Sequence, residues 1–245
     1  MECSLFGCVC GRTKEVHSVF YLKLMKYFWI PVLMSGVGSV IAAGGAASTG
    51  APNGDWPQYR GPRTDGVAAV PVAWKTDGLK TTWKVPSNGG FSSFAVSEGR
   101  AFTLVLKEVD GASQEVLVAM DAAKGAVLWE APLNVAKYDG GGNAGSKDNE
   151  GGDGPRSTPT VVGKAVVVMS SQLGLKAFDV TTGNALWARD LKSQHGGRNI
   201  QWQNAASPLL DGGLLYVEGG GAGQSLMAIN PANGEVVWKG FDEMM

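Results

Sequence analysis

An eleven-residue pattern occurs three times in the chain and constrains the fold more than any other feature. Each copy reads Ala-x-Asp/Asn-x-x-x-Gly-x-x-x-Trp, and the three copies align without gaps. From average residue usage, one such match has a chance of about 10⁻⁵ per window, so three matches indicate a true internal repeat. The repeated positions are Ala119, Asp121, Gly125 and Trp129; Ala177, Asp179, Gly183 and Trp187; and Ala228, Asn230, Gly234 and Trp238.

Each copy predicts a β-hairpin. The Asp or Asn side chain can bond to its own backbone in an Asx turn, and the Gly supplies the positive φ that the turn needs. The Trp then falls on the outer strand, where its flat ring can fill the space between neighbouring sheets. The small Ala lets those sheets approach closely, so we expect these positions to have a structural role.

Two further apolar segments precede each hairpin, so one repeat unit contains four strands. Four-stranded sheets repeated at about 40–50 residues are typical of a β-propeller. We therefore predict an all-β fold, a β-propeller of four-stranded antiparallel blades with tryptophan-docking repeats. The complete units are expected over 91–133, 156–191 and 204–241.

The ring is expected to be incomplete. Residues 81–86 predict one more outer strand, which carries Trp83 and has no hairpin partner of its own before it. Propellers of six to eight blades need roughly 300 residues or more. We therefore expect about three blades plus one extra strand, with exposed edges at both ends. A three-blade unit that closes through oligomerisation is the alternative.

The N-terminal segment has the pattern of a secretory signal peptide. Met25 and Lys26 open an apolar run over 27–43, and residues rich in Ala, Gly and Ser follow it. An uncleaved membrane anchor is the alternative, which Pro31 disfavours.

The predicted domains are therefore 1–48, an N-terminal extension plus signal peptide, and 49–245, a partial propeller. Because Met25 resembles a natural signal start, we interpret 1–24 as an upstream extension. We expect an exported protein, periplasmic or secreted, with no stable membrane span once the signal is cleaved.

Composition and charge exclude several classes of function. A formal net charge of −1 at pH 7 lacks the basic footprint of a nucleic-acid binder, so we expect no nucleic-acid partner. Two histidines and three cysteines leave little for a zinc site. The polar loop 139–153 has carboxylates and glycines that suit Ca²⁺, but its spacing does not match an EF-hand loop, so we expect no metal.

The repeats resemble the tryptophan-docking repeats of the PQQ-binding-like (quinoprotein-type) β-propeller superfamily. That superfamily includes quinoprotein alcohol dehydrogenases and BamB-like proteins. The opening Asp-Trp-Pro-Gln-Tyr-Arg-Gly-Pro at 55–62 is similar to the start of secreted PQQ-like repeat proteins. The resemblance covers about residues 55–241 and implies the fold more strongly than any activity.

The resemblance implies two functions. Dehydrogenases of this superfamily use calcium-bound PQQ and a disulfide between adjacent cysteines, whereas the last cysteine here is Cys10. No residue matches their calcium ligands or catalytic base, so we expect no catalytic residues and no cofactor. We expect a non-catalytic exported binding or scaffold module; the alternative is a relative of PQQ-dependent alcohol dehydrogenases, with PQQ and Ca as cofactors.

Candidate binding residues lie in the loops that enter each first strand, 84–91, 134–156 and 188–205. These loops are expected to gather near the ring axis and to bind a protein or cell-envelope ligand. The candidate ligand- or partner-binding residues are Arg156, His195, Trp202 and Asn204.

Each candidate also has a simpler interpretation. Arg156 could bind a ligand anion or pair with neighbouring carboxylates such as Asp153, and we expect the carboxylate pair. A lone loop histidine such as His195 is usually solvated or hydrogen-bonded. Trp202 breaks the blade pattern, so it is a better binding candidate, although ordinary loop packing also accounts for it.

Overall fold

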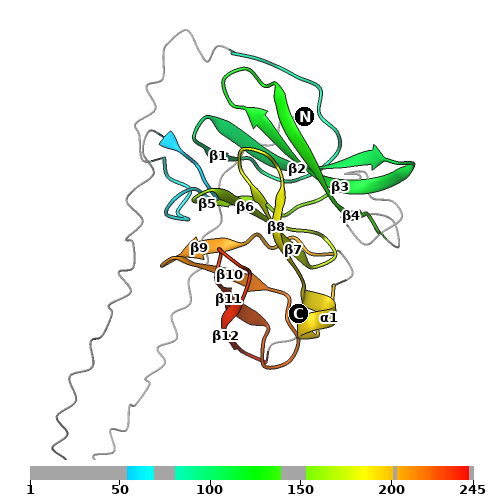
Figure 1. Ribbon diagram of the computed structural model, residues 1–245, viewed down its shortest axis with the longest axis vertical. Helices are drawn as coiled ribbons and strands as arrows, with labels where there is room; N and C mark the ends of the chain where they lie inside the picture. Colours follow the sequence, from blue (N-terminus) through cyan, green and yellow to red (C-terminus); the bar gives the residue numbers. More distant parts are fainter. Residues whose placement is uncertain (1–53, 69–80, 139–152, 201–202, 243–245) are drawn as a thin grey trace, which may run out of the picture. The chain divides into compact units, whose positions relative to one another are not determined.

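The computed structural model describes residues 54–68, 81–138, 153–200 and 203–242, and its strands form three four-stranded antiparallel sheets. Within each sheet the strands follow one another in sequence order, so each strand pairs with its neighbour along the chain. Figure 1 shows the three sheets in succession, coloured from green through yellow to red. The predicted all-β fold of four-stranded antiparallel blades is confirmed.

The strand bounds follow the repeat units. The first blade contains β1 (Ala95–Ser97), β2 (Arg100–Val109), β3 (Ala112–Asp121) and β4 (Val127–Val135). The second contains β5 (Thr160–Val162), β6 (Ala165–Met169), β7 (Gly174–Asp179) and β8 (Ala185–Asp190). The third contains β9 (Leu209–Asp211), β10 (Leu214–Glu218), β11 (Leu226–Ile229) and β12 (Val236–Gly240).

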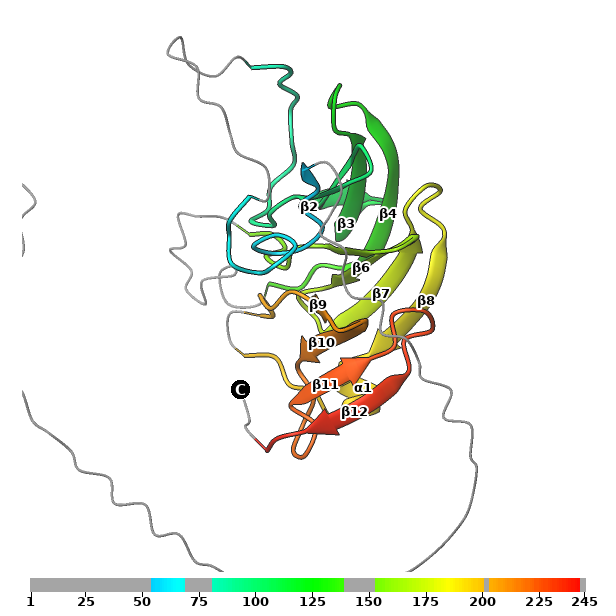
Figure 2. The same ribbon diagram turned by 90° about the vertical axis from the view of Figure 1, so that its left-hand side faces the viewer.

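The three blades form an open series within the described residues, as expected for an incomplete propeller. The first strands β1, β5 and β9 contact one another in turn, β1 with β5 and β5 with β9. Figure 2 shows the blades side by side in chain order.

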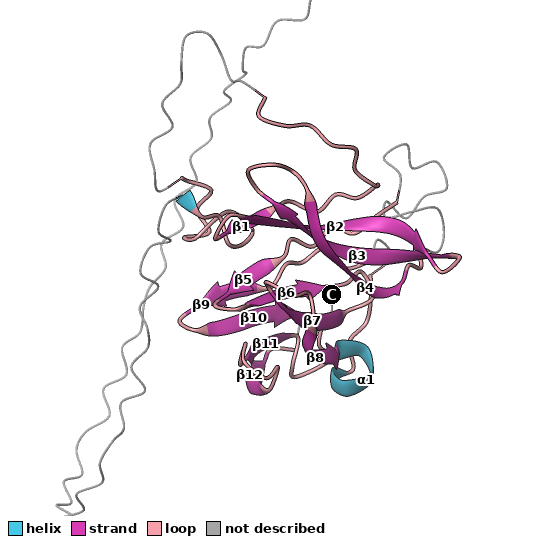
Figure 3. Ribbon diagram, turned by 45° about the horizontal axis from the view of Figure 1, so that its top comes forward, coloured by secondary structure: helices cyan, strands magenta, loops and turns pink. Residues whose placement is uncertain are grey.

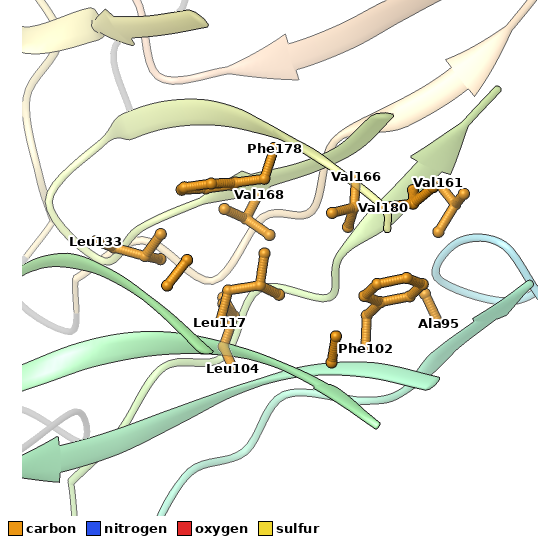
Figure 4. Packing of buried hydrophobic residues seen from close by; sticks show 12 residues of the cluster. Ala95, Phe102, Leu104, Leu117, Leu133, Val161, Val166, Val168, Phe178 and Val180 are labelled. Carbon is orange, nitrogen blue, oxygen red and sulfur yellow. The ribbon is translucent and has the colours of Figure 1, made fainter. Parts of the chain in front are cut away.

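Two apolar cores hold successive blades together. In the first core, Figure 4 shows Phe102 and Leu117 of the first blade facing Val166 and Phe178 of the second. The second core joins the second blade to the third and includes the fully buried Leu215. Because each fully buried side chain of this kind contributes roughly 1.5–3 kcal/mol, packing between blades is a main source of stability.

The hairpins form the predicted Asx turns. Asp179 Oδ1 accepts hydrogen bonds from the backbone N–H groups of Thr181 and Thr182 at 2.9 and 2.8 Å. These bonds hold the pKa of the Asp179 carboxyl below its usual range. The turn closes with a bond from Gly183 N to Asp179 O, and Gly183 has φ +73°.

Each docked tryptophan packs on the hairpin of the next blade. Trp129 donates from Nε1 to Val180 O at 3.2 Å, and Trp187 donates to Pro231 O at 2.8 Å. A Cβ added to Gly183 would lie 2.7 Å from the Trp129 ring, so only glycine fits beneath the ring. Trp129 and Trp187 thus pack between blades, as expected for the tryptophan of the repeat.

Residues 81–86 form no strand, and the prediction of an extra strand there is wrong. A strand needs a hydrogen-bonded neighbour, and no described strand pairs with this segment. Trp83 is nevertheless docked like the others, with Nε1 donating to Ala122 O at 3.0 Å and its ring packed over Gly125.

One short helix, α1 (Leu191–His195), lies within the segment predicted as the loop 188–205. Asp190 caps its start by accepting bonds from Lys192 N and Ser193 N, and Gly196 ends it in the left-handed conformation at φ +65°. Figure 3 shows α1 directly after β8 among the surrounding strands. Leu191 is fully buried, so the helix anchors this loop to the second core.

The predicted N-terminal extension and signal peptide fall within residues 1–53, outside the described residues. None of the helices in the described ranges has the length and apolar character needed to cross a membrane.

Candidate functional site

The segments that lead into the three first strands lie side by side. Phe91 N donates to Pro155 O at 2.8 Å, which joins the segment before β1 to the segment before β5. Thr158 N donates to Ser207 Oγ at 2.8 Å, which joins the segment before β5 to the segment before β9. The segments directly before β1, β5 and β9 therefore meet.

The segment 54–66 crosses the same region and binds all three blades. Trp56 exchanges two backbone hydrogen bonds with Val96 of β1, at 2.7 and 2.8 Å. Pro57 O accepts from Val161 N of β5 at 2.7 Å.

The third contact of this segment comes from a buried side chain. Gln58 is 3% exposed, and its amide donates to Leu210 O at 3.3 Å and accepts from Leu210 N at 2.8 Å in β9. Three successive residues thus bind the first strands of three blades. Sequence reasoning identified this motif only as a resemblance and assigned it no structural role.

A tight turn follows Gln58. Gly61 N donates to Gln58 O at 2.9 Å, and Arg60, the third residue of the turn, has φ +60°. Positive φ at this position alone is typical of a type II turn, where glycine or asparagine is usual. A Cβ on Gly61 would lie 2.8 Å from Cζ3 of Trp56, so this close packing fixes the turn against the blades.

These segments enclose a groove of about 1020 Å³. Its walls carry three aromatic side chains, two arginines and one carboxylate, and the remaining described lining is small, hydroxyl-bearing or aliphatic. The aromatic and charged residues are Tyr59, Phe91, Tyr216, Arg60, Arg156 and Glu218. Such a mixture of apolar surface and a few charged groups is typical of a binding site.

Arg156 lines this groove, and its expected partner carboxylate is not found among the described residues. Its guanidinium lies over the Phe91 ring, with Cζ 5.2 Å from the ring centroid. Neither of the salt bridges in the described part of the chain includes Arg156. Asp153 is exposed, and the stack on Phe91 directs the guanidinium to the groove instead.

Two other predicted candidates, His195 and Asn204, are not among the residues that line the groove. His195 Nδ1 lies 3.2 Å from Gln224 Oε1, and Gln224 Nε2 donates to His195 O at 2.9 Å. Asn204 is 7% exposed, and its Oδ1 accepts from Ala206 N at 3.2 Å. The His195 side chain therefore contacts the Gln224 side chain, and the Asn204 side chain holds nearby backbone. Trp202 lies outside the described residues.

A buried carboxyl links the first two blades and was not predicted. Glu115 of β3 is fully buried; its Oε1 accepts from Tyr138 Oη at 2.8 Å and its Oε2 accepts from Ser171 N at 3.0 Å. Burial, with the adjacent Glu115, raises the pKa of the Tyr138 hydroxyl. The polar Glu115 beside the apolar run 116–120 was the available sequence signal.

Metal ligands do not gather in the described part of the chain. No group of three or more His, Cys, Asp or Glu side chains there could hold a metal ion. The predicted acidic loop lies mostly over 139–152, outside the described residues.

Comparison with solved structures gives similar folds at low identity. BamB from Moraxella catarrhalis is 19% identical, with a TM-score of 0.38 and a match over 61% of this chain and 34% of that one. The quinohemoprotein alcohol dehydrogenase ADHIIG from Pseudomonas putida HK5 is 20% identical, with a TM-score of 0.45 and a match over 62% of this chain and 20% of that one. The matched region thus spans about a third of the first protein and a fifth of the second. Comparison with curated proteins gives no match.

The family comparison covers most of the chain. The matching model is described as outer membrane protein assembly factor BamB, and it aligns with residues 68–243. That range contains all three blades and their tryptophan-docking hairpins. The chain belongs to the family described as outer membrane protein assembly factor BamB.

Proposed function

We propose that this protein is an exported, non-catalytic binding module that holds a protein or cell-envelope ligand in the groove. The observation that carries this proposal is the meeting of all three blade-entry segments with the segment 54–66 around one groove. Loops held by a rigid scaffold are a common place for binding residues.

The rigidity of the groove supports a binding role. Trp56, Pro57 and Gln58 bind successive first strands, and Phe91 and Thr158 bind neighbouring blade-entry segments. A preformed surface loses little conformational entropy when a ligand binds, which favours affinity.

Exposed apolar side chains on the groove also support it. Phe91 is 46% exposed and Tyr59 is 54% exposed, and both line the groove. Large aromatic side chains that are exposed in a concave site supply much of the binding energy at protein interfaces.

Site-specific photo-crosslinking tests the proposal. A photo-reactive benzoylphenylalanine replaces Phe91 in the groove or, as a matched control, Leu186, which is 52% exposed on β8 and does not line the groove. We expect a discrete crosslinked species from the Phe91 position only. Equal crosslinking from both positions, or none from Phe91, would contradict a groove-centred binding role.

PQQ-dependent oxidation is the alternative function. Two arginines suit the carboxylates of PQQ, but a Ca²⁺ site uses six to eight oxygen ligands, and the described groove lining has one carboxylate, Glu218. The described residues thus do not fit a calcium-bound cofactor. Titration with PQQ and CaCl₂, followed by absorbance and dye-linked alcohol oxidation, tests this; stoichiometric cofactor with turnover would replace the scaffold proposal.

The proposed export is tested by the N-terminal sequence of the mature protein. We expect cleavage within the small-residue stretch 42–48, which N-terminal sequencing of the protein from the producing cell would locate. An intact N-terminus in the membrane fraction would instead support the uncleaved anchor.

A further inference from the structure

Three arginines in or near the groove differ in how their charge is neutralised. Arg63 forms an ion pair with Asp65, with Nε 2.9 Å from Oδ2. Arg60 and Arg156 line the groove, and neither forms an ion pair with any described residue. The described lining of the groove therefore holds two positive charges against one carboxylate, that of Glu218.

Among the described residues, Arg156 is held in place without a counter-charge. Its guanidinium is stacked on Phe91, and its Nε is buried with no hydrogen-bond partner in the described part of the chain. Arg156 as a whole is only half-buried and lines the groove, so a carboxylate in the groove can pair with its guanidinium. Guanidinium groups bind carboxylates in a bidentate geometry, which adds specificity.

Arg60 occupies a strained backbone position at the same groove. Its φ of +60° costs an ordinary side chain roughly 1–2 kcal/mol relative to the right-handed region. The strain is maintained by the bonds Gly61 N to Gln58 O and Gly66 N to Arg60 O. Strained non-glycine residues held by their surroundings cluster at functional sites.

We propose that Arg60 and Arg156 form an anion-binding pair that recognises an acidic peptide segment of the ligand. This proposal rests on the proposed binding function and specifies the chemistry of its ligand. The arginines take carboxylate side chains, while Tyr59, Phe91 and Leu209 contact apolar side chains between them. Side chains at every second position of an extended peptide share one face, so acidic and apolar residues in turn at those positions present both kinds of group to the groove.

Two fluorescein-labelled octapeptides test the proposal by fluorescence polarisation with the purified full chain. One has Glu, Leu and Phe in turn at every second position, so that they share one face of the extended chain; the other has Gln in place of each Glu. We expect tighter binding of the Glu peptide, and about a tenfold loss of its affinity for each of Arg156→Gln and Arg60→Gly. Arg63→Gln is the matched control, because it removes one charge from the same segment outside the groove, and its affinity should be unchanged.

Arg60→Gly separates binding from folding. Glycine tolerates φ +60° without strain, so this variant should unfold at the same or a higher temperature than the original chain. A stable Arg60→Gly variant that loses only the Glu peptide supports the proposal.

The outcomes distinguish this proposal from the binding function on which it rests. Equal binding of both peptides, unaffected by Arg60→Gly and Arg156→Gln, would overturn anion recognition and leave a groove that binds peptides without regard to charge. Binding of neither peptide would also overturn it, whereas the binding function itself would then be decided by the crosslinks from Phe91. An equal loss of affinity in Arg63→Gln would show a general charge effect and overturn the specific pair.

Discussion

At the scale of single residues, the contact between tryptophan and glycine defines the joint between blades. The glycine needs positive φ for its turn and also needs no side chain, because the tryptophan ring of the preceding unit occupies that space. Gly125, Gly183 and Gly234 all meet both requirements. Turn geometry for each copy was predictable from sequence, whereas the ring above each glycine required the packing of two blades.

Gly183→Ala tests the two requirements separately. Gly99 is the matched control, since it has φ +74° and no atom within 4 Å of an added Cβ. Alanine at Gly99 should cost about 1–2 kcal/mol from backbone strain alone. Alanine at Gly183 should cost about 1–3 kcal/mol more, because the Trp129 ring must move.

Urea unfolding of both variants measures this difference as a change in the free energy of unfolding. Equal losses for Gly99→Ala and Gly183→Ala would mean that the turn, and not the ring contact, requires glycine.

The Asx turns also give the protein a predictable acid response. The pKa of Asp179 is lowered by the backbone N–H groups of Thr182 and Thr181, so the folded state binds a proton less readily than the unfolded state. Its stabilising contribution is therefore present above the ordinary aspartate pKa of 3.8 and is lost as pH falls below it.

Asp179→Asn tests this contribution to acid stability. Asparagine is the residue found at the same position of the third repeat, Asn230. The amide oxygen still accepts the turn bonds, as Asn230 Oδ1 does from Ala232 N at 3.0 Å. We expect a shallower fall in melting temperature in acid than in the original chain. Melting curves from neutral pH to below 3.8 measure it, and unchanged acid dependence would exclude Asp179 as a contributor.

At the scale of strands and loops, the sequence predicts what is periodic and misses what depends on tertiary contact. The strand β6 (Ala165–Met169) is one of the two apolar segments expected before the second hairpin, and its apolar run ends at turn residues. The segment 81–86 has an outer-strand sequence but no neighbour to pair with. The helix α1 was missed although Asp190 and Gly196 are good caps, because five residues give no helical periodicity.

The candidate site shows the same division. Arg156 was identifiable because it opens a repeat unit, and the structure places it in the groove. Arg60 was not identified, since its significance lies in its φ and in a contact between segments distant in sequence. Asn204 and His195 have polar side chains in a predicted loop, but neither lines the groove. The Asn204 side chain bonds to backbone, and the His195 side chain contacts the Gln224 side chain.

Gln58→Ala tests the contact between the segment 54–66 and the third blade. The substitution leaves Leu210 N and Leu210 O without their partner, which should cost about 1–3 kcal/mol of unfolding free energy. Gln194→Ala, at an exposed position in α1, is the control and should change stability by less than about 0.5 kcal/mol. Chemical denaturation compares the two, and a neutral Gln58→Ala would show that this contact does not stabilise the fold.

At the scale of the whole described structure, each contact between a tryptophan and a hairpin runs from one unit to the next unit along the chain. Trp83, Trp129 and Trp187 each dock on the hairpin of the next unit, whereas Trp238 is 44% exposed and contacts Phe241 at a centroid distance of 6.0 Å. The tryptophan of the repeat is therefore packed between blades in the first two copies and exposed in the third.

Trp187→Ala and Trp238→Ala should differ accordingly. Removal of the docked Trp187 ring leaves a cavity between the second and third blades and should cost about 2–4 kcal/mol. Removal of Trp238 should cost less than about 1 kcal/mol, as at other exposed positions. Thermal unfolding of both variants provides the comparison, and equal losses would mean that Trp238 is buried in solution by a contact outside the described structure.

The hydrogen bonds between Gln58 and Leu210 join residues 152 positions apart. Contacts between such distant residues form late, because a large loop must close before they contribute. A chain synthesised from its N-terminus exposes Gln58 long before Leu210 exists. The segment that completes the groove is therefore made early but takes its place last, so a competent binding surface reports that all three blades have folded.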